Sequence, residues 1–580
     1  MGKSPLTNPA DTHDPPVPAV PLGNLLDQRA ADHGGRLALS FPGAEVTYAE
    51  LAARADFFAR GLLALDIRPG EAVGILLPNC VDSLAALFGA AKIGALPVPI
   101  STRFKSLELD QVIRHSGMRV LFTSPPTAGA PAFPDLLLEA FPHLSGRTGA
   151  VPDQGEPCAL EHAVLLGGES RAGFTSEDRF REAARRVDPE HALRRQASVR
   201  AGDTAVVMYT SGTTASPKGA MISHEAFGCL AAGLTHTRFF LTPEDRVWTM
   251  LPLFHIGGIA FALAALYAGC SFHHVGFFSP DTALDLLEAQ RCTVVLPGFE
   301  TVWLPVVDRP DFRERDFSSI RLVMVVGVPE RLRDMASRLP NAVHVSCFGM
   351  TEASSFLSLN HQSDTLEQRT TTGGHPMPGM ECRVVEPDTG RPLPPNTEGE
   401  LLFRGTNCFD GYFRDPELTA ASFDDQGWFH TGDVATIDPD GRVTFVARLK
   451  DMLKVGGENV SAAEVEDYLL RHPAVNVAQV VAAPDAYYVE VPAAFVELKP
   501  GASVTEEELI AFCVGNIAAY RVPRYVRFVT EWPMSGTKVK KYQLREYIAD
   551  ELRANGITEA PRPQAAHRPS AARLESADPA

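Results

Sequence analysis

The stretch YTSGTTASPKGAMISH, residues 209–224, has the residue types of a loop that could hold phosphate. A strand-like run, 204–210, leads into small and hydroxylated residues whose backbone N–H groups and hydroxyls can point at one anion. Gly212 and Gly219 allow the backbone to approach closely, and Lys218 adds a point charge. Such clusters are also common in surface loops, but the full stretch ending in Pro-Lys-Gly favours a polyphosphate site, although it lacks the G-x-x-x-x-G-K-[ST] pattern.

Four more segments carry side chains suited to nucleotide chemistry. They are CFGMTE (347–352), GWFHTGDVATI (427–437), ARLKDMLKVGGENVSAAEVE (447–466) and WPMSGTKVKKYQLRE (532–546). Each segment alone has an ordinary interpretation: respectively a helix start capped by Thr351, a turn, a solvated charge run and a basic surface strand. Their occurrence together in one chain is what favours a functional interpretation.

Together these segments resemble the signature motifs of the adenylate-forming superfamily, which contains acyl- and aryl-CoA synthetases, peptide-synthetase adenylation domains and firefly-type luciferases. The resemblance extends from about Leu25 to Arg545 and is strongest to fatty-acid or medium-chain and alicyclic acyl-CoA ligases. It implies an α/β fold, with a large N-terminal domain of helix-covered sheets and a small mobile α+β C-terminal domain. It also implies an AMP-forming acid–thiol ligase that uses ATP, Mg²⁺ and CoA, first making an acyl-adenylate and pyrophosphate and then passing the acyl group to a thiol.

The same resemblance implies the roles of individual residues. Phe348 would pack on adenine, Asp433 would accept hydrogen bonds from the ribose, and Arg448 would reach the ribose or a phosphate. The implied catalytic residues are Lys538, Lys218, Glu352 and Thr351, with Glu352 and Thr213 at the metal. The implied ATP/AMP-binding residues are Thr210, Ser211, Gly212, Thr213, Thr214, Lys218, Gly327, Phe348, Gly349, Met350, Thr351, Asp433, Arg448 and Lys538. The implied hinge is Lys450, and the implied CoA-binding residues are Lys454, Gly456 and Gly457.

The segment with the predicted catalytic lysine departs from the usual motif of the superfamily. Thr537 stands before Lys538 where glycine is common, and the loop is one residue short, so Lys540 and Lys541 are alternatives. Ser535 to Lys538 also spells S-x-x-K, but the S-D-N and K-T-G companions of penicillin-binding enzymes do not occur in the sequence. The sequence also lacks a G-x-S-x-G elbow, so serine hydrolysis has no support.

The segment LPLFHIGGIAF, residues 251–261, narrows the class of acid substrate. Amino-acid-activating relatives usually carry an aspartate here to pair with the ammonium group, whereas this chain has Phe254 and His255. We therefore expect an apolar acid, aliphatic, alicyclic or aromatic, and mostly apolar pocket walls. His255 either gates or lines the pocket or is a structural core residue. The expected acid-binding residues are His255, Gly257, Phe299, Val326 and Gly327.

Two other functions are compatible with these motifs. An adenylating enzyme could load the phosphopantetheine of a carrier protein or stop at acyl-AMP, and a catalytically idle paralogue could merely bind nucleotide. The GGEN run at 456–459 and Lys450 favour a full two-step cycle, but they do not distinguish free CoA from a carrier-bound arm. A homodimer is an assembly that the resemblance allows.

The elements that must position these residues alternate between helical and strand periodicity, which predicts an α/β architecture. We expect helices at 24–34 and 80–94, strands at 72–78 and 119–124, and buried core segments rather than membrane spans at 85–100 and 257–269. The expected domains are a disordered tail at 1–21, an N-terminal AMP-binding domain at 22–449, a C-terminal cap at 450–555 and a disordered tail at 556–580.

Three local patterns predict where elements of the chain begin or turn. Ser461 with Glu464, and Thr505 with Glu508, have capping-box spacing and would start helices. Ser223 would start another helix after the phosphate-loop stretch. Residues 438–441, Asp-Pro-Asp-Gly, predict a hairpin because proline and glycine supply the backbone angles of a tight turn.

The overall composition excludes several classes of partner. With 53 basic and 71 acidic residues the net charge is -18, which argues against broad attraction to nucleic acid or to an anionic membrane. The 9 cysteines are scattered without a C-x-x-C pair, as expected of reduced thiols. The first residues lack an apolar signal core, so we expect a cytoplasmic protein whose partners are a small carboxylic acid, ATP and CoA.

Overall fold

The computed structural model describes residues 20–126, 132–145, 159–210, 218–387, 389–449, 452–455, 458–514, 516–517, 519–535 and 538–561. Several predicted positions lie outside these residues: Ser211, Gly212, Thr213, Thr214, Lys450, Gly456 and Gly457, together with the side chains of Lys454 and Lys538. The described residues form two compact units. The first runs as far as Thr431 and takes in Thr436–Phe445, and the second comprises Gly432–Ala435 and the chain from Val446 onward.

The largest sheet of the first unit has seven strands in the order β14-β13-β12-β10-β11-β1-β2. Its neighbouring strands are parallel except for the antiparallel pair β1 and β2. Helix α9 (Ile256–Ala268) packs on β10 and β11, and it is almost wholly buried, as the apolar run at 257–269 predicts. The strands are β1 (Leu37–Phe41), β2 (Ala44–Thr47), β10 (Arg246–Thr249), β11 (Ser271–His274), β12 (Val294–Phe299), β13 (Leu322–Val326) and β14 (Val343–Val345).

A second sheet of the first unit is parallel throughout, in the order β4-β3-β5-β6-β7. Its strands are β3 (Ala72–Leu76), β4 (Leu96–Pro99), β5 (Val120–Thr123), β6 (His162–Leu165) and β7 (Thr175–Ser176). Every residue of β3, β4 and β5 is buried, as expected of parallel strands covered on both faces. The strands and helices predicted at 24–34, 72–78, 80–94 and 119–124 are confirmed as α1 (Leu22–His33), β3, α3 (Val81–Lys92) and β5.

Three smaller sheets follow, and in the last of them Gly432–Ala435 of β21 and residues 446–448 of β22 belong to the second unit. Their orders are β20-β9-β8, β15-β16-β17 and β18-β19-β21-β22. The predicted hairpin at 438–441 is confirmed, since β21 ends at Ile437, β22 begins at Val443 and Gly441 has a φ of 89°. The strands are β8 (Thr204–Thr210), β9 (Lys218–Ser223), β15 (Cys347–Phe348), β16 (Ser358–Leu359), β17 (His375–Pro376), β18 (Met380–Val385), β19 (Gly399–Gly405), β20 (Gly411–Tyr412), β21 (Phe429–Ile437) and β22 (Val443–Arg448).

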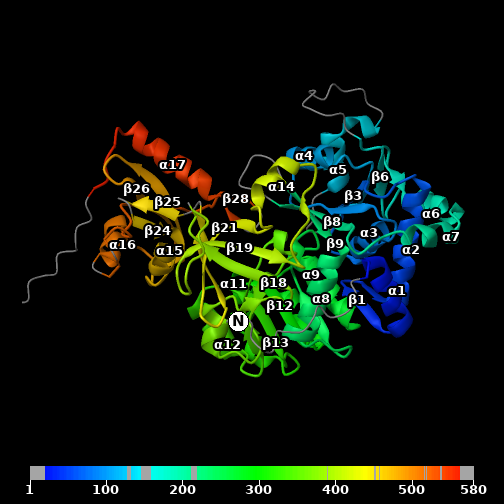
Figure 1. The fold of residues 1–580 in the computed structure, drawn as a ribbon, viewed down its shortest axis with the longest axis horizontal. Coiled ribbons are helices and arrows are strands. Elements are labelled where there is room, and N and C mark those ends of the chain that lie inside the picture. Colours follow the sequence, from blue (N-terminus) through cyan, green and yellow to red (C-terminus); the bar gives the residue numbers. More distant parts are fainter. Residues whose placement is uncertain are drawn as a thin grey trace, which may run out of the picture. The chain divides into compact units, whose positions relative to one another are not determined.

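Helices cover these sheets, and α1, α2 and α3 pack on one another at the N-terminal end of the first unit (Figure 1). Nζ of the buried Lys92 lies 2.6 Å from carboxylate oxygens of both Asp27 and Asp56, which ties α3 to α1 and α2. The α-helices of this unit besides α9 are α1 (Leu22–His33), α2 (Tyr48–Ala64), α3 (Val81–Lys92), α4 (Ser106–Ser116), α5 (Phe133–Ala140), α6 (Glu177–Arg186), α7 (Pro189–Gln196), α8 (His224–Gly233), α10 (Pro280–Ala289), α11 (Glu300–Val307), α12 (Pro329–Arg338), α13 (Leu366–Thr371) and α14 (Pro416–Ser422). A π-helical turn, Leu234–Arg238, extends α8, and short 3₁₀ turns lie at Pro142–Ser145, Phe312–Glu314 and Thr351–Ala353.

The second unit is an α+β structure with one five-stranded sheet and a two-stranded sheet of β28 and β29. The five-stranded sheet has the order β24-β23-β26-β25, with β27 also paired to β26, and α15 and α17 pack on β25. Ser461 and Thr505 accept hydrogen bonds from the N–H groups of Glu464 and Glu508, so both predicted helix starts are confirmed. The elements are β23 (Met452–Val455), β24 (Glu458–Ser461), α15 (Ala462–Leu470), β25 (Val475–Asp485), β26 (Val489–Leu498), α16 (Glu506–Cys513), β27 (Tyr525–Phe528), β28 (Met534–Ser535), β29 (Lys538–Val539) and α17 (Lys541–Ala554).

The chain beyond α17 returns to the turn between β25 and β26. The carboxylate of Asp485 accepts hydrogen bonds from the N–H groups of Tyr487 and Tyr488 within that turn, and one from Ala560 at 2.6 Å. The N–H of Ala486 donates to the carbonyl oxygen of Thr558 at 2.8 Å. One buried carboxylate therefore holds both the turn and the returning segment.

Candidate active site

The two ends of the predicted phosphate loop lie opposite each other on an antiparallel pair of strands. β8 ends at Thr210 and β9 begins at Lys218, and these two residues are partners in the register of the pair. Residues 211–217 between them are outside the described chain. A Cβ on Gly219 would come within 2.9 Å of the Val207 side chain, so the strand pair is closely packed there. The pairing therefore fixes the point at which the chain re-enters the sheet, at Lys218. Ser223, at the other end of β9, caps α8 as predicted.

The side chain of Lys218 lies against a buried tyrosine that also contacts Glu352. Nζ of Lys218 is 5.4 Å from the centre of the Tyr412 ring, which is a cation–π distance. The Tyr412 hydroxyl donates a hydrogen bond of 2.9 Å to Oε1 of Glu352. Burial and the Glu352 carboxylate both raise the pKa of Tyr412 well above its ordinary value, so the hydroxyl stays protonated. Two predicted catalytic residues are thus joined through a residue that the sequence motifs did not single out.

Glu352 lies in the 3₁₀ turn Thr351–Ala353 and is 9% exposed. Its carbonyl oxygen accepts a hydrogen bond of 2.9 Å from the N–H of Phe409, so its main chain and its side chain are both held by the segment around β20. Within the described residues no lysine or arginine pairs with this carboxylate, although an uncompensated buried charge is costly. A hard divalent cation shared with phosphate oxygens would supply the positive charge.

The described residues contain no group of three or more His, Cys, Asp or Glu side chains arranged to hold a metal ion. A cation beside Glu352 would therefore need phosphate oxygens, water or other protein oxygens to complete its ligands. This ligand set suits Mg²⁺, which usually binds through one or two carboxylates plus substrate phosphates and keeps several waters. The buried carboxylate thus fits the predicted metal.

The backbone around the 347–352 motif has room for nothing larger than glycine at position 349. A Cβ on Gly349 would lie 1.8 Å from the carbonyl oxygen of Ser355. The carbonyl oxygen of Met350 accepts hydrogen bonds from the N–H groups of Ala353 and Ser355, which closes the turn that carries Thr351 and Glu352. Ser355 also has a φ of 110°, a strained conformation for a residue other than glycine.

Phe348, the predicted adenine contact, lies parallel to a second aromatic ring. The ring centroids of Phe348 and Phe445 are 5.6 Å apart and the rings are inclined by 16°. Phe445 belongs to β22 and is 43% exposed, so part of its side chain is accessible. Flat faces of this kind suit a purine base, which stacks on aromatic rings.

In the second unit, the two residues predicted at the ribose form an ion pair. Nε of Arg448 lies 2.8 Å from Oδ1 of Asp433, whose side chain is 1% exposed. A carboxylate has about four lone-pair positions, so Asp433 can accept further hydrogen bonds while paired with the guanidinium. The arrangement is therefore compatible with ribose hydroxyls as additional donors.

The lysines near the C-terminal end of the second unit have different surroundings. Lys538 begins β29 and is the register partner of Ser535 on β28. Nζ of Lys541 lies 2.6 Å from Oε1 of Glu466, which also accepts a hydrogen bond from the N–H of Val480. Lys541 thus links α17 to α15, which makes it a poor alternative to Lys538, and Lys540 precedes α17 as its N-cap residue.

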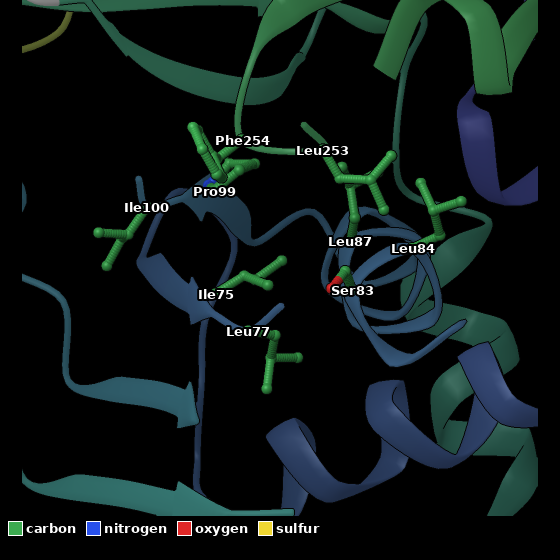
Figure 2. A pocket seen from close by; sticks show the side chains of 9 residues that line it. All are labelled: Ile75, Leu77, Ser83, Leu84, Leu87, Pro99, Ile100, Leu253 and Phe254. Carbon is green, nitrogen blue, oxygen red and sulfur yellow. The ribbon is translucent and has the colours of Figure 1, made fainter. Parts of the chain in front are cut away.

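His255 is an exposed helix cap rather than a core residue, so that alternative is wrong. Its Nδ1 accepts a hydrogen bond of 3.1 Å from the N–H of Gly257 at the start of α9. The preceding residues, Leu253 and Phe254, line a small apolar cavity together with side chains of the second sheet and α3 (Figure 2). Its volume is about 10 Å³, enough for roughly one water molecule. The other lining residues are Ile75, Leu77, Ser83, Leu84, Leu87, Pro99 and Ile100.

The remaining predicted acid-binding residues lie side by side on β12 and β13. Phe299 and Val326 are register partners, and Gly327 follows Val326. A Cβ on Gly327 would come within 2.2 Å of Oε2 of Glu300, which accepts a hydrogen bond from the N–H of Val328. The other oxygen of Glu300 pairs with Arg331 at 2.9 Å. An ion pair therefore fills the space beside the glycine, and the acid-binding role of Phe299, Val326 and Gly327 stays a prediction.

Comparison with known proteins identifies the family of the chain. A model described as AMP-binding enzyme matches residues 26–413, and a model described as AMP-binding enzyme C-terminal domain matches residues 464–538. The chain belongs to the AMP-binding enzyme family. The predicted superfamily is confirmed, and so is the α/β fold with a larger N-terminal and a smaller C-terminal domain.

Relatives of this AMP-binding enzyme have named activities. The chain is 30% identical to the mitochondrial medium-chain acyl-CoA ligase ACSF2 of Mus musculus over 92% of its own length and 88% of the relative. It is 32% identical to a feruloyl-CoA synthase of an Amycolatopsis species over 90% of its own length and 98% of the relative. It is also 26% identical to the anthranilate CoA ligase AuaEII in a crystal structure with anthranoyl-AMP, with a TM-score of 0.79 over 93% of this chain and 99% of that one.

Three residues of this AMP-binding enzyme that the sequence motifs did not single out lie against predicted site residues: Tyr412, Phe445 and Glu300. Tyr412 could have been noticed as an aromatic beside a glycine in strand β20, but its partners are remote in sequence. Phe445 carried a weak signal as a lone aromatic three residues before Arg448. Across the described residues, no helix has both the length and the apolar composition needed to cross a membrane.

Proposed function

We propose that this chain is an ATP-dependent acyl-CoA ligase that activates an apolar carboxylic acid as acyl-AMP and transfers the acyl group to the thiol of CoA. The observation that carries the proposal is the match to both AMP-binding enzyme models, together with the similarity of about nine-tenths of the chain to a medium-chain acyl-CoA ligase and a feruloyl-CoA synthase. The contacts among Lys218, Tyr412 and Glu352 support it, because they gather the charges that a polyphosphate and its cation need.

In the first half-reaction, a carboxylate oxygen attacks the α-phosphorus of ATP and pyrophosphate leaves. The work of the protein is to position two anions and to neutralise charge as it develops. We assign charge neutralisation to Lys218 and Lys538 and the metal-holding carboxylate to Glu352. Mg²⁺, when bound, supplies a Lewis acid at the phosphate oxygens. Thr351 would contact the α-phosphate.

Nucleotide recognition is assigned to aromatic and polar groups outside the phosphates. Phe348 and Phe445 offer flat faces for adenine, and Asp433 offers acceptor positions for the ribose while paired with Arg448. Each assignment concerns one residue. It is tested by substituting that residue and measuring the change in the affinity for ATP. Substitution of Asp433 with asparagine keeps the shape of the side chain and removes its charge, which makes it the most informative of these changes.

In the second half-reaction, the thiol of CoA attacks the acyl-adenylate and AMP leaves. We propose that the C-terminal cap turns about Lys450 between the two half-reactions, so that the segment with Lys454, Gly456 and Gly457 replaces Lys538 at the site. Substitution of Lys450 with proline should block thioester formation while adenylation continues. Unchanged overall ligation in that variant would contradict the hinge assignment.

The decisive experiment gives the purified protein ATP, Mg²⁺, CoA and a panel of aliphatic, alicyclic and aromatic acids, with mass detection of acyl-AMP and acyl-CoA. Failure to form acyl-AMP from any acid would overturn the proposal. Acyl-AMP without acyl-CoA would instead support an enzyme that loads a carrier protein or stops at the adenylate. A panel is needed because the named relatives act on different acids, one medium-chain and one feruloyl.

The proposal includes finer points that follow from the sequence expectations. Mg²⁺ is the proposed metal, the cytoplasm the proposed location and a homodimer the proposed assembly. Replacing Mg²⁺ with Ca²⁺ tests the first point, since Ca²⁺ prefers longer and more numerous oxygen contacts. Fractionation of cells tests the cytoplasmic location against the mitochondrial location that the name of one relative states. Light scattering of the purified protein tests whether it is a homodimer.

A further inference from the structure

Tyr412 contacts a cation on its ring and an anion at its hydroxyl. Nζ of Lys218 lies 5.4 Å from the ring centre, and the hydroxyl donates to Oε1 of Glu352 at 2.9 Å. We propose that Tyr412 is a positioning residue that fixes the Glu352 carboxylate for its cation and keeps Lys218 from pairing with that carboxylate. The inference rests on the proposed function, since it concerns the same phosphate site.

The backbone around Tyr412 places its side chain on the same face as Lys218. Tyr412 on β20 is the register partner of Ala220 on β9, and Lys218 is two residues before Ala220. Because alternate residues of a strand share a face, the Lys218 and Tyr412 side chains meet diagonally across the strand pair. The main chain of Tyr412 is held further by Thr419, whose hydroxyl accepts a hydrogen bond of 2.8 Å from its N–H.

The ring of Tyr412 is held as firmly as its backbone. The residue is 6% exposed, and Phe409 packs edge-on against the ring with the centroids 4.9 Å apart. Phe409 also donates its N–H to the carbonyl oxygen of Glu352 at 2.9 Å. The segment 409–412 therefore reaches Glu352 through one main-chain and one side-chain hydrogen bond, which leaves the carboxylate little freedom to rotate.

The charges explain why such a spacer is needed. A lysine ammonium and a buried carboxylate attract each other strongly where water is scarce. A direct pair between Lys218 and Glu352 would leave neither charge available to a phosphate or to a cation. The protonated hydroxyl of Tyr412 satisfies one oxygen of Glu352 with a neutral donor, and the ring face gives the ammonium a weaker partner that a phosphate can displace.

The test measures ATP binding as a function of Mg²⁺ concentration by calorimetric titration of the full-length protein. Tyr412→Phe removes the donor but keeps the ring, and we expect the Mg²⁺ concentration for half-maximal ATP binding to rise about tenfold, as when other groups that orient metal ligands are lost. Tyr412→Leu also removes the ring, and we expect weaker ATP binding even at saturating Mg²⁺. The matched control is Tyr48→Phe, which removes the hydrogen bond of a buried tyrosine to the carbonyl oxygen of Cys270.

A double-mutant cycle separates positioning from a general effect on folding. If Tyr412 acts through Glu352, then Tyr412→Phe should have no further effect on the Mg²⁺ requirement once Glu352→Gln is present. An unchanged Mg²⁺ requirement in Tyr412→Phe, or additive effects of the two substitutions, would overturn the inference. Absence of ATP binding by the wild-type protein at every Mg²⁺ concentration would overturn the proposed function itself, so the two failures are distinguishable.

Discussion

Four buried histidines should make the first unit of the protein sensitive to mild acid. His224, His273, His274 and His344 are at most 4% exposed. Burial lowers the pKa of each to about 4, because the charged imidazolium would lose its hydration. The unfolded chain binds protons at these groups below about pH 6.5, whereas the folded protein does not. Stability is therefore complete above that pH and falls as the pH drops toward 4.

Two of these histidines also accept a main-chain hydrogen bond at the ring nitrogen that protonation would occupy. Nδ1 of His224 accepts a hydrogen bond of 3.1 Å from the N–H of Leu22, and Nδ1 of His274 accepts one of 2.9 Å from the N–H of Gly276. A proton on either nitrogen would face the N–H that now donates to it. Protonation therefore breaks these contacts in addition to placing a charge in the core.

The magnitude follows from the pKa values. A histidine whose pKa falls from 6.5 to about 4 on folding removes about 2 kcal/mol from the free energy of unfolding between pH 7.5 and pH 5.0. Four such residues would remove about 8 kcal/mol, which is comparable to the whole stability of a typical domain. Asp410, whose pKa is raised to about 6 by desolvation and by Glu225, offsets part of this loss.

The assay is urea denaturation at a series of pH values, followed by tryptophan fluorescence. Trp248 and Trp303 are fully buried in the first unit. Trp248 on β10 is the register partner of His273 on β11, so its fluorescence reports on the sheet that contains His273 and His274. Near pH 5.5 we expect about three protons to be taken up on unfolding, read from the slope of stability against pH. Uptake of less than about one proton would refute the reasoning. His273→Gln should lower the uptake by nearly one, because it removes one of the four buried imidazoles.

Three further predictions concern single residues. Lys92→Met should lower the free energy of unfolding by about 2 kcal/mol in urea denaturation, because two carboxylates lose their shared partner; equal stability would contradict this. Gly349→Ala should abolish adenylate formation in a pyrophosphate-exchange assay, while Gly202→Ala, where a Cβ meets only open space, should not; activity in the first variant would show that the turn can relax. Lys538→Ala should stop acyl-AMP formation but spare thioester formation from supplied acyl-AMP, as measured by mass detection of both products. Lys541→Ala should lower the melting temperature while acyl-AMP formation continues.

Elements with a local pattern were predictable from the sequence, and contacts between distant segments were not. The apolar run of α9 and the caps at Ser223 and Thr505 follow from residues within a few positions of one another. The hydrogen bond between Tyr412 and Glu352 joins residues 60 positions apart, and no periodicity indicates it. Long-range side-chain contacts depend on which strands become neighbours, which a single sequence does not state.

In the candidate site, too, residues within local motifs were predictable, whereas contacts between residues distant in sequence were not. Motifs predicted Lys218, Phe348 and Asp433 because their neighbours in sequence are distinctive. The ion pair of Glu300 with Arg331 was not predicted, since two charged residues 31 positions apart look like ordinary surface charges until β12 and β13 are paired. The two adjacent histidines of β11 were also overlooked, because a polar pair contradicts the apolar composition usual for a buried parallel strand.

The segment that returns to Asp485 sets a limit on how far the second unit can be shortened. A chain cut directly after α17, at Asn555, would retain α15, α16 and α17 but lose Thr558 and Ala560. The N–H of Ala486 and one oxygen of Asp485 would then lack the partners they have now, at a buried carboxylate where such losses are expensive. An isolated second unit for crystallisation or NMR should therefore extend at least to Pro561, and fusion partners belong beyond that residue.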